Sequence, residues 1–506
     1  MLFPTLTFAL FFAVVLPVSW ALRRQIVAWK LFMLAASYVF YAAWNWRFVG
    51  LIILTTLFNE VLGIAIHRSQ EAGRRKGLVT LAVAANLGML GVFKYYDFFI
   101  ESFNSLFGTS IPLADIVLPV GISFFTFQAI SYTVDIYRRD AAPVPLLDFA
   151  VYLAFFPQLV AGPIVRATEF MPQLLTRRPP DQVDSSRAVL LIASGLFKKV
   201  VISSFLGRAI VDDVFANPDG HSGLEILVSV YAYAIQIYAD FSGYTDIAIG
   251  VALLLGFRFP LNFDRPYSSV SVQDFWRRWH MTLSRWLRDY LYFPLGGNRG
   301  SNLTTYRNLL IVMTLGGLWH GAGGAFLLWG LWHGLGLCAE RFLSDLRGEE
   351  DRPLGEADIR IQEIAALHTG SRVEPWRPDP TSPVPFAPLQ VRKLWLGRLV
   401  TFHFVCAGWL LFRVGTGGGG LGDAVSMFTR IFTAFSFDAP LVTPLVVLVI
   451  LGSLAVQFIP DIYSQQWHAA FSRLTPVVQS MGLGVWIALV VALGPEGVSP
   501  FIYFQF

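Results

Sequence analysis

The chain is poor in charge. Of its 506 residues, 14% are Asp, Glu, Lys or Arg and 55% are hydrophobic, and the mean hydropathy is +0.56. Soluble domains carry roughly a quarter charged residues, so this composition excludes an ordinary soluble protein and predicts an integral membrane protein. The formal net charge of +4 gives no argument for a nucleic-acid partner.

Cysteine is scarce as well. The two cysteines, Cys338 and Cys406, both lie in apolar surroundings. They exclude a disulfide scaffold and a cysteine-based zinc site, and they fit small core residues. We see no other constellation of metal ligands, so we expect no bound metal and no bound cofactor.

Long apolar runs take the place of charge. A membrane-spanning helix needs about 20 mostly apolar residues, and many stretches come near that length, although several are short. The runs lack the alternation of a β-barrel. We therefore predict an all-α protein, one polytopic membrane domain over 1–506, with about eleven transmembrane helices together with re-entrant and interfacial helices.

Basic residues predict the orientation. Arg23, Arg24 and Lys30 follow the first apolar run, and the basic stretch 67–76 follows the third. Positive loops lie in the cytoplasm, which puts the N-terminus outside. Met1 leads directly into apolar residues with no basic region before them, so we expect the first segment to be retained as a span.

The segment 346–393 differs in composition from the rest of the chain. It is rich in proline and in charges of both signs, so it cannot bury an apolar face. We expect a water-exposed loop between two spans.

Polar residues cluster in the stretch Asp274–Tyr290, which has the spacing of one amphipathic helix with three Trp and four Arg. One interpretation is an interfacial anchor. The other uses the edge shared by Arg277, His280 and Ser284, which could bind an anionic group such as the nucleotide end of coenzyme A. The sequence leaves both open.

His320 is the strongest candidate for chemistry. Five glycines surround it in Thr314–Gly324. Glycine breaks helix regularity and lets backbone or ligand approach closely, so we expect a helix break with room around the imidazole. The alternative is a histidine that bonds a carbonyl. On a continuous helix His333, 13 residues later, would face about 140° away, which favours a structural role for it unless the helix breaks.

Two carboxylates, Asp240 and Asp246, lie in the polar stretch Gln236–Asp246 between apolar runs. We expect a discontinuous helix that lines a polar cavity. Either carboxylate could orient a catalytic imidazole or pair with an arginine. Proline and glycine in 157–166 predict another break, with a structural role.

Five segments of this sequence resemble the membrane-bound O-acyltransferase family, in its bacterial branch of alginate O-acetyltransferase-like proteins: Phe156–Arg166, Tyr238–Asp246, Asp274–Leu287, Tyr292–Gly297 and Gly317–Gly321. The resemblance implies tilted helices around a central pore, a catalytic core at about 140–340, and a near-invariant histidine that matches His320. A second family histidine matches His280. Trp319, Arg277, Ser284, Asp240 and Asp246 are the candidate substrate-binding residues.

The function that the resemblance implies is acetyl transfer across the cytoplasmic (inner) membrane. Acetyl-CoA, as a substrate, would bring the thioester to His320, whose imidazole would act as general base. The acetyl group would pass to a periplasmic or extracellular acetyltransferase partner that O-acetylates a polysaccharide such as alginate.

Three alternatives remain, one within the acyltransferase class and two from other classes. A teichoic-acid-type acyltransferase would take its acyl group from a carrier-protein thioester. A transporter or flippase would share the broken helices and buried charges, but the sequence has no inverted repeat, and transport needs no histidine base. A purely structural membrane subunit fits poorly with the buried polar residues.

Overall fold

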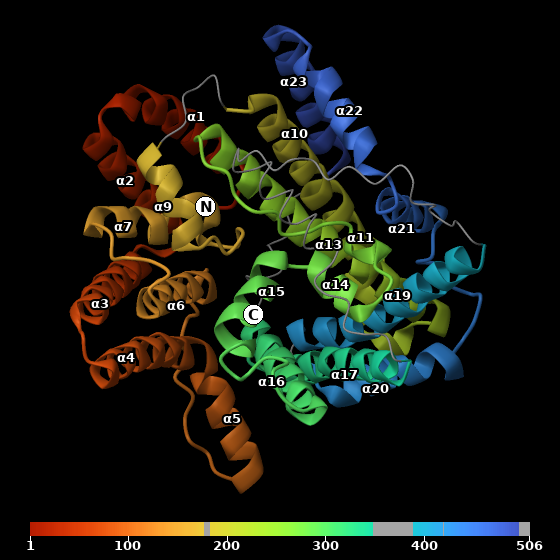
Figure 1. Ribbon diagram of the computed structural model, residues 1–506. Coiled ribbons are helices and arrows are strands. Elements are labelled where there is room, and N and C mark those ends of the chain that lie inside the picture. The colour runs from red at the N-terminus through yellow and green to blue at the C-terminus, as the bar shows by residue number, and fades with distance from the viewer. Residues whose placement is uncertain (177–182, 348–387, 418, 495–506) are drawn as a thin grey trace. The chain divides into compact units, whose positions relative to one another are not determined.

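The computed structural model describes residues 1–176, 183–347, 388–417 and 419–494 (Figure 1). All regular secondary structure in these ranges is helical, which confirms the predicted all-α class for the described part. Six helical segments are long and apolar enough to cross a membrane, and Pro444–Val456 and Val477–Leu493 are shorter apolar helices. The chain is therefore a multi-pass membrane protein, while the count of about eleven spans and the re-entrant segments stay predictions.

The chain divides into two compact units that alternate along the sequence. Unit 1 comprises Met1–Val201, Asp240–Phe259 and His468–Phe506, and unit 2 comprises Ile202–Ala239 and Pro260–Trp467. Helix α13 (Gly223–Leu254) contributes its first half to unit 2 and its second half to unit 1. This helix is continuous, so the discontinuous helix predicted around Asp240 is wrong. Ser242, Gly243 and Thr245 are weak helix formers, but within a membrane the backbone must make its hydrogen bonds internally, which keeps the segment helical.

Unit 1 is held together by polar pairs between helices. The Asn86 side chain donates to Asn59 Oδ1 over 2.7 Å, and the Tyr132 hydroxyl donates to Glu60 over 2.8 Å. In a membrane such groups need partners within the protein. The helices of unit 1 are α1 (Leu6–Ala21), α2 (Ile26–Asn45), α3 (Val49–Arg68), α4 (Ala72–Leu90), α5 (Tyr96–Phe107), α6 (Ile122–Arg138), α7 (Leu146–Ala154), α8 (Phe156–Leu159), α9 (Ala167–Thr176), α10 (Ser185–Leu196) and α23 (Pro476–Leu493).

The break predicted in 157–166 is present. Helix α8 ends at Leu159, and a Cβ at Gly162 would lie 2.6 Å from the Gln158 backbone. The close approach of the chain to itself requires a glycine here.

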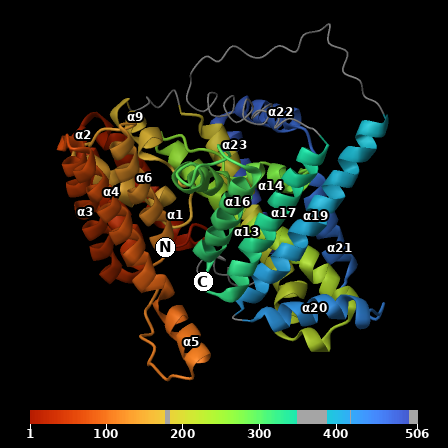
Figure 2. The same ribbon diagram turned by 60° about the horizontal axis from the view of Figure 1, so that its bottom comes forward.

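Unit 2 is built around a helical hairpin. Helices α16 (Asn302–His320) and α17 (Gly324–Leu346) lie side by side, and α19 (Pro388–Thr416) packs along α17 (Figure 2). The Ser301 hydroxyl caps α16 by accepting from the Thr304 N–H. The other helices of unit 2 are α11 (Ser204–Leu206), α12 (Asp212–Ala216), α14 (Val272–Arg278), α15 (Met281–Leu287), α20 (Leu421–Thr433) and α21 (Pro444–Val456), while α22 (Asp461–Ser472) passes from unit 2 into unit 1.

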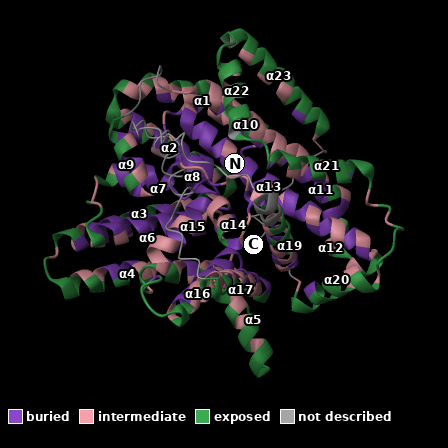
Figure 3. Cartoon of the chain, turned by 45° about the vertical axis from the view of Figure 1, so that its right-hand side comes forward, coloured by how far each residue is buried: buried purple, intermediate pink, exposed green. Residues whose placement is uncertain are grey.

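Most of the predicted loop 346–393 lies outside the described residues. Its two ends are described: α17 stops at Leu346, and α19 already begins at Pro388, so the loop is shorter than predicted at its C-terminal end. Figure 3 shows buried residues concentrated along α13 and exposed residues along α20 and α23.

Candidate active site

His320 is the last residue of α16. The chain leaves the helix at Gly321, which is extended (φ −158°), and α17 begins three residues later at Gly324. The predicted break at His320 is therefore confirmed. The imidazole is 2% exposed, so it sits in the interior of unit 2.

The sequence predicts open space at the glycines around His320. Two of these glycines instead allow the two helices of the hairpin to touch. A Cβ on Gly317 would lie 2.2 Å from the Phe326 carbonyl oxygen, and one on Gly321 would lie 2.1 Å from the Phe326 ring. These positions let the backbones of α16 and α17 touch and let a ring fill the gap. The prediction of room is wrong at Gly317 and Gly321, because protein atoms occupy the volume that a side chain would fill, whereas a Cβ on Gly324 would meet nothing within 4 Å.

Aromatic rings surround the His320 imidazole. The ring centroids of Trp319 and Trp329 each lie 5.0 Å from it, and that of Phe412 lies 5.3 Å away. The Trp329 ring meets it edge to face at 86°. The Trp329 indole N–H is buried and has no hydrogen-bond acceptor among the described residues. A reaction here would take place in an apolar, water-poor setting that carries buried indole N–H donors.

His280 breaks the helix predicted over Asp274–Tyr290. Helix α14 ends at Arg278, α15 starts at Met281, and His280 between them has φ 41° and ψ 53°. A non-glycine residue in this left-handed region costs roughly 1–2 kcal/mol and is a feature of functional sites. Trp279 and Trp286 are buried within the protein, and the interfacial interpretation of this stretch stays a prediction.

Asn262 holds His280 in this conformation. Its backbone carbonyl accepts the Met281 N–H (2.9 Å). Its side-chain oxygen accepts the Thr282 backbone N–H (3.2 Å) and hydroxyl (2.9 Å), and it lies 3.1 Å from His280 Nδ1. A backbone N–H can only donate, so the Asn262 atom is an oxygen and His280 Nδ1 must carry the proton. Nε2 is then the basic nitrogen of this imidazole.

His280 is neutral at physiological pH. The side chain is fully buried, and this burial lowers its pKa to about 3, because the protonated form cannot be solvated. A neutral imidazole with a defined tautomer can accept a proton or a hydrogen bond through Nε2.

The two candidate histidines lie together. Their ring centroids are 6.5 Å apart, and Trp319 lies 5.9 Å from His280. Residues far apart in sequence thus form one site of two imidazoles and an indole. His280, His320 and Trp319 are the three predicted residues that the structure brings together.

His333 joins the same aromatic cluster from the opposite side. Trp276 donates its indole N–H to His333 Nδ1 over 3.3 Å, and the Trp329 ring lies 5.0 Å from the His333 ring. Because the helix breaks after His320, the angular argument that separated the two histidines does not apply. Trp329 lies between them and contacts both. The structural role predicted for His333 stays a prediction.

Arg277 and Ser284 do not share an edge with His280, because the helix is interrupted between them. Arg277 is half-buried on α14. The Ser284 hydroxyl lies 3.3 Å from the Trp279 carbonyl, to which it donates. The shared edge that suggested substrate binding is therefore absent, and a role of Arg277 and Ser284 in substrate binding stays a prediction.

Asp240 and Asp246 form ion pairs in unit 1. Asp240 pairs with Lys199, and both side chains are almost fully buried; Asp246 pairs with Lys198 at 2.5 Å and is partly exposed. The pairing alternative of the sequence is thus present, with lysines in place of the expected arginines. A role in substrate binding remains a prediction.

The sequence reasoning missed the partners of the predicted residues, which are Lys198 and Lys199 in unit 1 and Trp329 and Asn262 in unit 2. Lys198 and Lys199 carried a usable signal, since two adjacent charges interrupt an apolar run and such charges need partners. Trp329 lies in an apolar run with no distinguishing pattern. Asn262 lies 18 residues before His280, and nothing in the local pattern connects the two.

Comparison with known proteins identifies relatives of the chain. The sequence profile of the membrane-bound O-acyltransferase family matches residues 40–348. A protein named "Probable alginate O-acetylase" from Azotobacter vinelandii is 45% identical over 335 residues, which is 64% of this chain and 66% of that protein. A peptidoglycan O-acetyltransferase from Helicobacter pylori is 38% identical over 342 residues, 62% of this chain and 65% of that protein.

The extent of these matches differs. In the first two relatives the chain spans slightly less than two thirds of their length. Another "Probable alginate O-acetylase", from Pseudomonas putida, is 34% identical over 511 residues and covers 94% of both chains. The matched range, residues 40–348, contains both histidines of the site.

Proposed function

Because the chain belongs to the membrane-bound O-acyltransferase family, we propose that it is a membrane O-acyltransferase. Its two neighbouring histidines transfer an acetyl group to a hydroxyl of a periplasmic partner, which then O-acetylates a polysaccharide outside the cytoplasm. The observation that carries the proposal is the 6.5 Å spacing of the His280 and His320 rings in a buried aromatic site. The relatives named as alginate O-acetylase and peptidoglycan O-acetyltransferase support the acetyl group and the polysaccharide.

His320 acts as the general base in this proposal. It takes the proton of the attacking hydroxyl while the hydroxyl oxygen forms a bond to the thioester carbonyl carbon. The carbon–sulfur bond then breaks, the ester is the product, and the sulfur leaves as a thiol that regains the proton. The donor is a thioester, with acetyl-CoA from the cytoplasm as the proposed form.

His280 contributes a second neutral imidazole. Asn262 fixes its proton on Nδ1, so Nε2 can accept a hydrogen bond from a second O–H or N–H of the acceptor molecule, since the single proton of the attacking hydroxyl goes to His320. The left-handed backbone of His280 is a fixed cost of folding, so it preorganises the ring before substrate arrives. His280 is thereby an orienting group and His320 the base.

The carbonyl oxygen becomes negatively charged in the tetrahedral intermediate and needs a donor. The buried Trp329 indole N–H is the candidate, because its ring contacts His320 edge to face. In an apolar site one such donor is worth about 10²–10³ in rate.

The acceptor side of the reaction would lie outside the cytoplasm. We place the protein in the cytoplasmic membrane with its N-terminus outside, from the distribution of its basic loops. A periplasmic acetyltransferase partner would receive the acetyl group and deliver it to the glycan.

The test replaces His320 with Ala in the full chain and measures release of thiol from labelled acetyl-CoA and acetylation of the polysaccharide. Both should be lost with expression and membrane insertion unchanged. His403→Ala is the matched control, since His403 is an exposed histidine of α19. Retained thiol release in His320→Ala would contradict the assignment of the base, and absence of thiol release in the wild type would favour a transporter.

A second variant separates the ring of His280 from its backbone. Asn tolerates the left-handed conformation better than other residues, so His280→Asn keeps the break between α14 and α15 and removes the imidazole. We expect a folded protein with strongly reduced kcat. Wild-type kcat in this variant would remove His280 from the site.

A further inference from the structure

A basic cleft lies in unit 1 at the end of α1, apart from the histidines. The candidate span Leu6–Arg24 exposes a stripe of apolar side chains at Leu6, Leu10 and Val14 and ends in the two arginines Arg23 and Arg24. A stripe at this spacing on a membrane span faces lipid. The arginines therefore lie at the level where hydrocarbon gives way to lipid headgroups, where Arg and Trp are favoured.

The cleft beside these arginines has a volume of about 510 Å³, within the roughly 300–1,000 Å³ of ligand sites. Its polar lining is Arg23, Arg24 and Ser185, and Leu16 and Leu254 give it an apolar wall. Trp20 is part of the lining and is held in place, because its indole N–H donates to the Leu254 carbonyl over 3.1 Å. A ligand here would meet charge at one end and hydrocarbon at the other.

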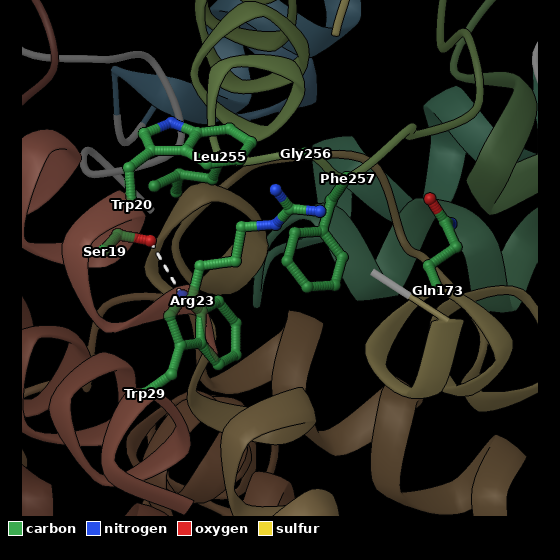
Figure 4. Close-up of a pocket in the computed structure, with 8 residues that line it drawn as sticks. All are labelled: Ser19, Trp20, Arg23, Trp29, Gln173, Leu255, Gly256 and Phe257. Carbon is green, nitrogen blue, oxygen red and sulfur yellow. Dashed lines mark hydrogen bonds between the residues drawn. The ribbon is translucent and has the colours of Figure 1, made fainter. Parts of the chain in front are cut away.

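Arg23 has a fixed position and Arg24 an open one. Figure 4 shows the Arg23 side chain extending into the group of lining residues that includes Trp29 and Phe257. Its guanidinium carbon lies 5.5 Å from the Trp20 ring centroid. Trp29 is itself fixed by a 2.8 Å bond to the Ser19 hydroxyl. Arg24 is exposed. It is therefore the side chain that can turn toward a ligand in the cleft.

More positive charge stands close by. Arg187, on the first turn of α10, interacts electrostatically with Arg258, and Gln173 fixes the Arg258 backbone by bonds of 2.8 and 3.0 Å. Asp184 is the acid of this region; it accepts the Arg187 N–H (2.9 Å) and lies 3.1 Å from His468 Nε2. Two arginines and one carboxylate thus lie next to the Ser185 end of the cleft, in addition to Arg23 and Arg24 of its lining, and this excess of positive charge favours an anion.

We propose that this cleft binds the phosphate headgroup of an anionic membrane phospholipid. Arg24 and Arg23 bind the phosphate, the Ser185 hydroxyl donates to it at the N-terminal end of α10, and an acyl chain lies along Leu16 and Leu254 toward the exposed stripe of α1. The apolar wall favours a lipid over a free phosphate compound, because a soluble anion would leave that wall exposed to water.

The test measures lipid binding to the purified full chain by native mass spectrometry, with phosphatidylglycerol and phosphatidylcholine as probes. The wild type should bind phosphatidylglycerol more tightly than phosphatidylcholine. Arg24→Gln should weaken phosphatidylglycerol binding about fivefold, as expected for one basic residue near a lipid surface. The matched control is Arg68→Gln, because Arg68 is also an exposed arginine at the end of a candidate span; it should bind as the wild type does.

A second variant guards against a misfolded protein. Ser185→Glu puts a negative charge at the rim of the cleft and at a helix N-terminus, where it favours folding, and should abolish the preference for phosphatidylglycerol. Equal weakening by Arg24→Gln and Arg68→Gln would reduce the effect to general surface charge and overturn the site. Competition by glycerol 3-phosphate at the same concentration would overturn the lipid as its ligand.

Discussion

The hydrogen bond between Asn262 and His280 predicts how many protons inhibit the reaction at low pH when Asn262 is replaced by Asp. In Asn262→Asp a carboxylate replaces the amide oxygen that lies 3.1 Å from His280 Nδ1. Opposite unit charges about 4 Å apart attract by about 4 kcal/mol at an effective dielectric constant near 20, which is an upper limit of about three pKa units. Since the new carboxylate must itself be desolvated, we expect a rise of about one to three units.

The sign follows from which form of His280 the carboxylate favours. The pKa of His280 is about 3 in the wild type, and the carboxylate stabilises the protonated ring, so the pKa rises to roughly 4–6. A reaction that needs neutral imidazoles loses activity as the pH falls through each pKa. In the wild type one imidazole base produces the acid limb, and the slope of log kcat/KM against pH should be 1. In the variant two protons inhibit, and the slope should approach 2 below the raised pKa.

The assay is thiol release from acetyl-CoA by the purified protein in detergent from about pH 4 to 9, with folding checked at each pH by size-exclusion chromatography. Thr282→Val is the control from the same site. It removes one of the donors to the Asn262 oxygen and costs about 1 kcal/mol of stability, but it leaves the His280 bond and the slope of 1. A slope of 1 in a folded Asn262→Asp protein, or a slope of 2 in the wild type, would refute the assignment of a neutral His280 with its proton on Nδ1.

Three further predictions concern other parts of the structure. Gly317→Ala would put a Cβ 2.2 Å from a carbonyl oxygen of α17, whereas the Cβ of Gly324→Ala would meet nothing within 4 Å. Thermal unfolding should show a loss of about 1–3 kcal/mol of stability for Gly317→Ala, and thiol release should show that most of its activity is lost. Gly324→Ala should keep both its stability and its activity. Lys199→Met leaves the Asp240 charge buried and should cost roughly 3–5 kcal/mol, and adding Asp240→Leu should restore both folded yield and activity; a double variant that folds but is inactive would move Asp240 into the active site. Trp329→Phe keeps a ring and removes the N–H, so kcat should fall roughly 10²-fold with KM unchanged, and an unchanged kcat would end its role as oxyanion donor.

The sequence indicated His320 because the signal is local. Five glycines around one histidine in an apolar run predict a break, and the break is there. The conformation of His280 could not be predicted in the same way. Its spacing fits a helix on both sides, and what turns the backbone left-handed is a set of bonds to Asn262, which a helical periodicity does not contain.

The carboxylates of α13 show a second kind of limit. Asp240 and Asp246 were visible as buried charges that need partners, and the two possible uses were stated. Which use applies depends on Lys199 and Lys198, which lie 41 and 48 residues earlier in the chain. Packing between helices decides such pairs, and a single sequence without packing gives no distance between them.

The glycines of the hairpin determine which side chain of α17 lies beside His320. Gly317 faces the backbone of α17, and Gly330 in turn faces Met313 of α16, where a Cβ would lie 2.3 Å from the carbonyl oxygen. Two such contacts, 13 residues apart in sequence, fix the register of the two helices. With this register Trp329, the residue before Gly330, meets the His320 ring, and His333 follows one turn later against the same indole. The close approach of two backbones therefore determines which indole stands beside the base, so a larger residue at Gly330 should impair catalysis through Trp329 even though it touches neither histidine nor substrate.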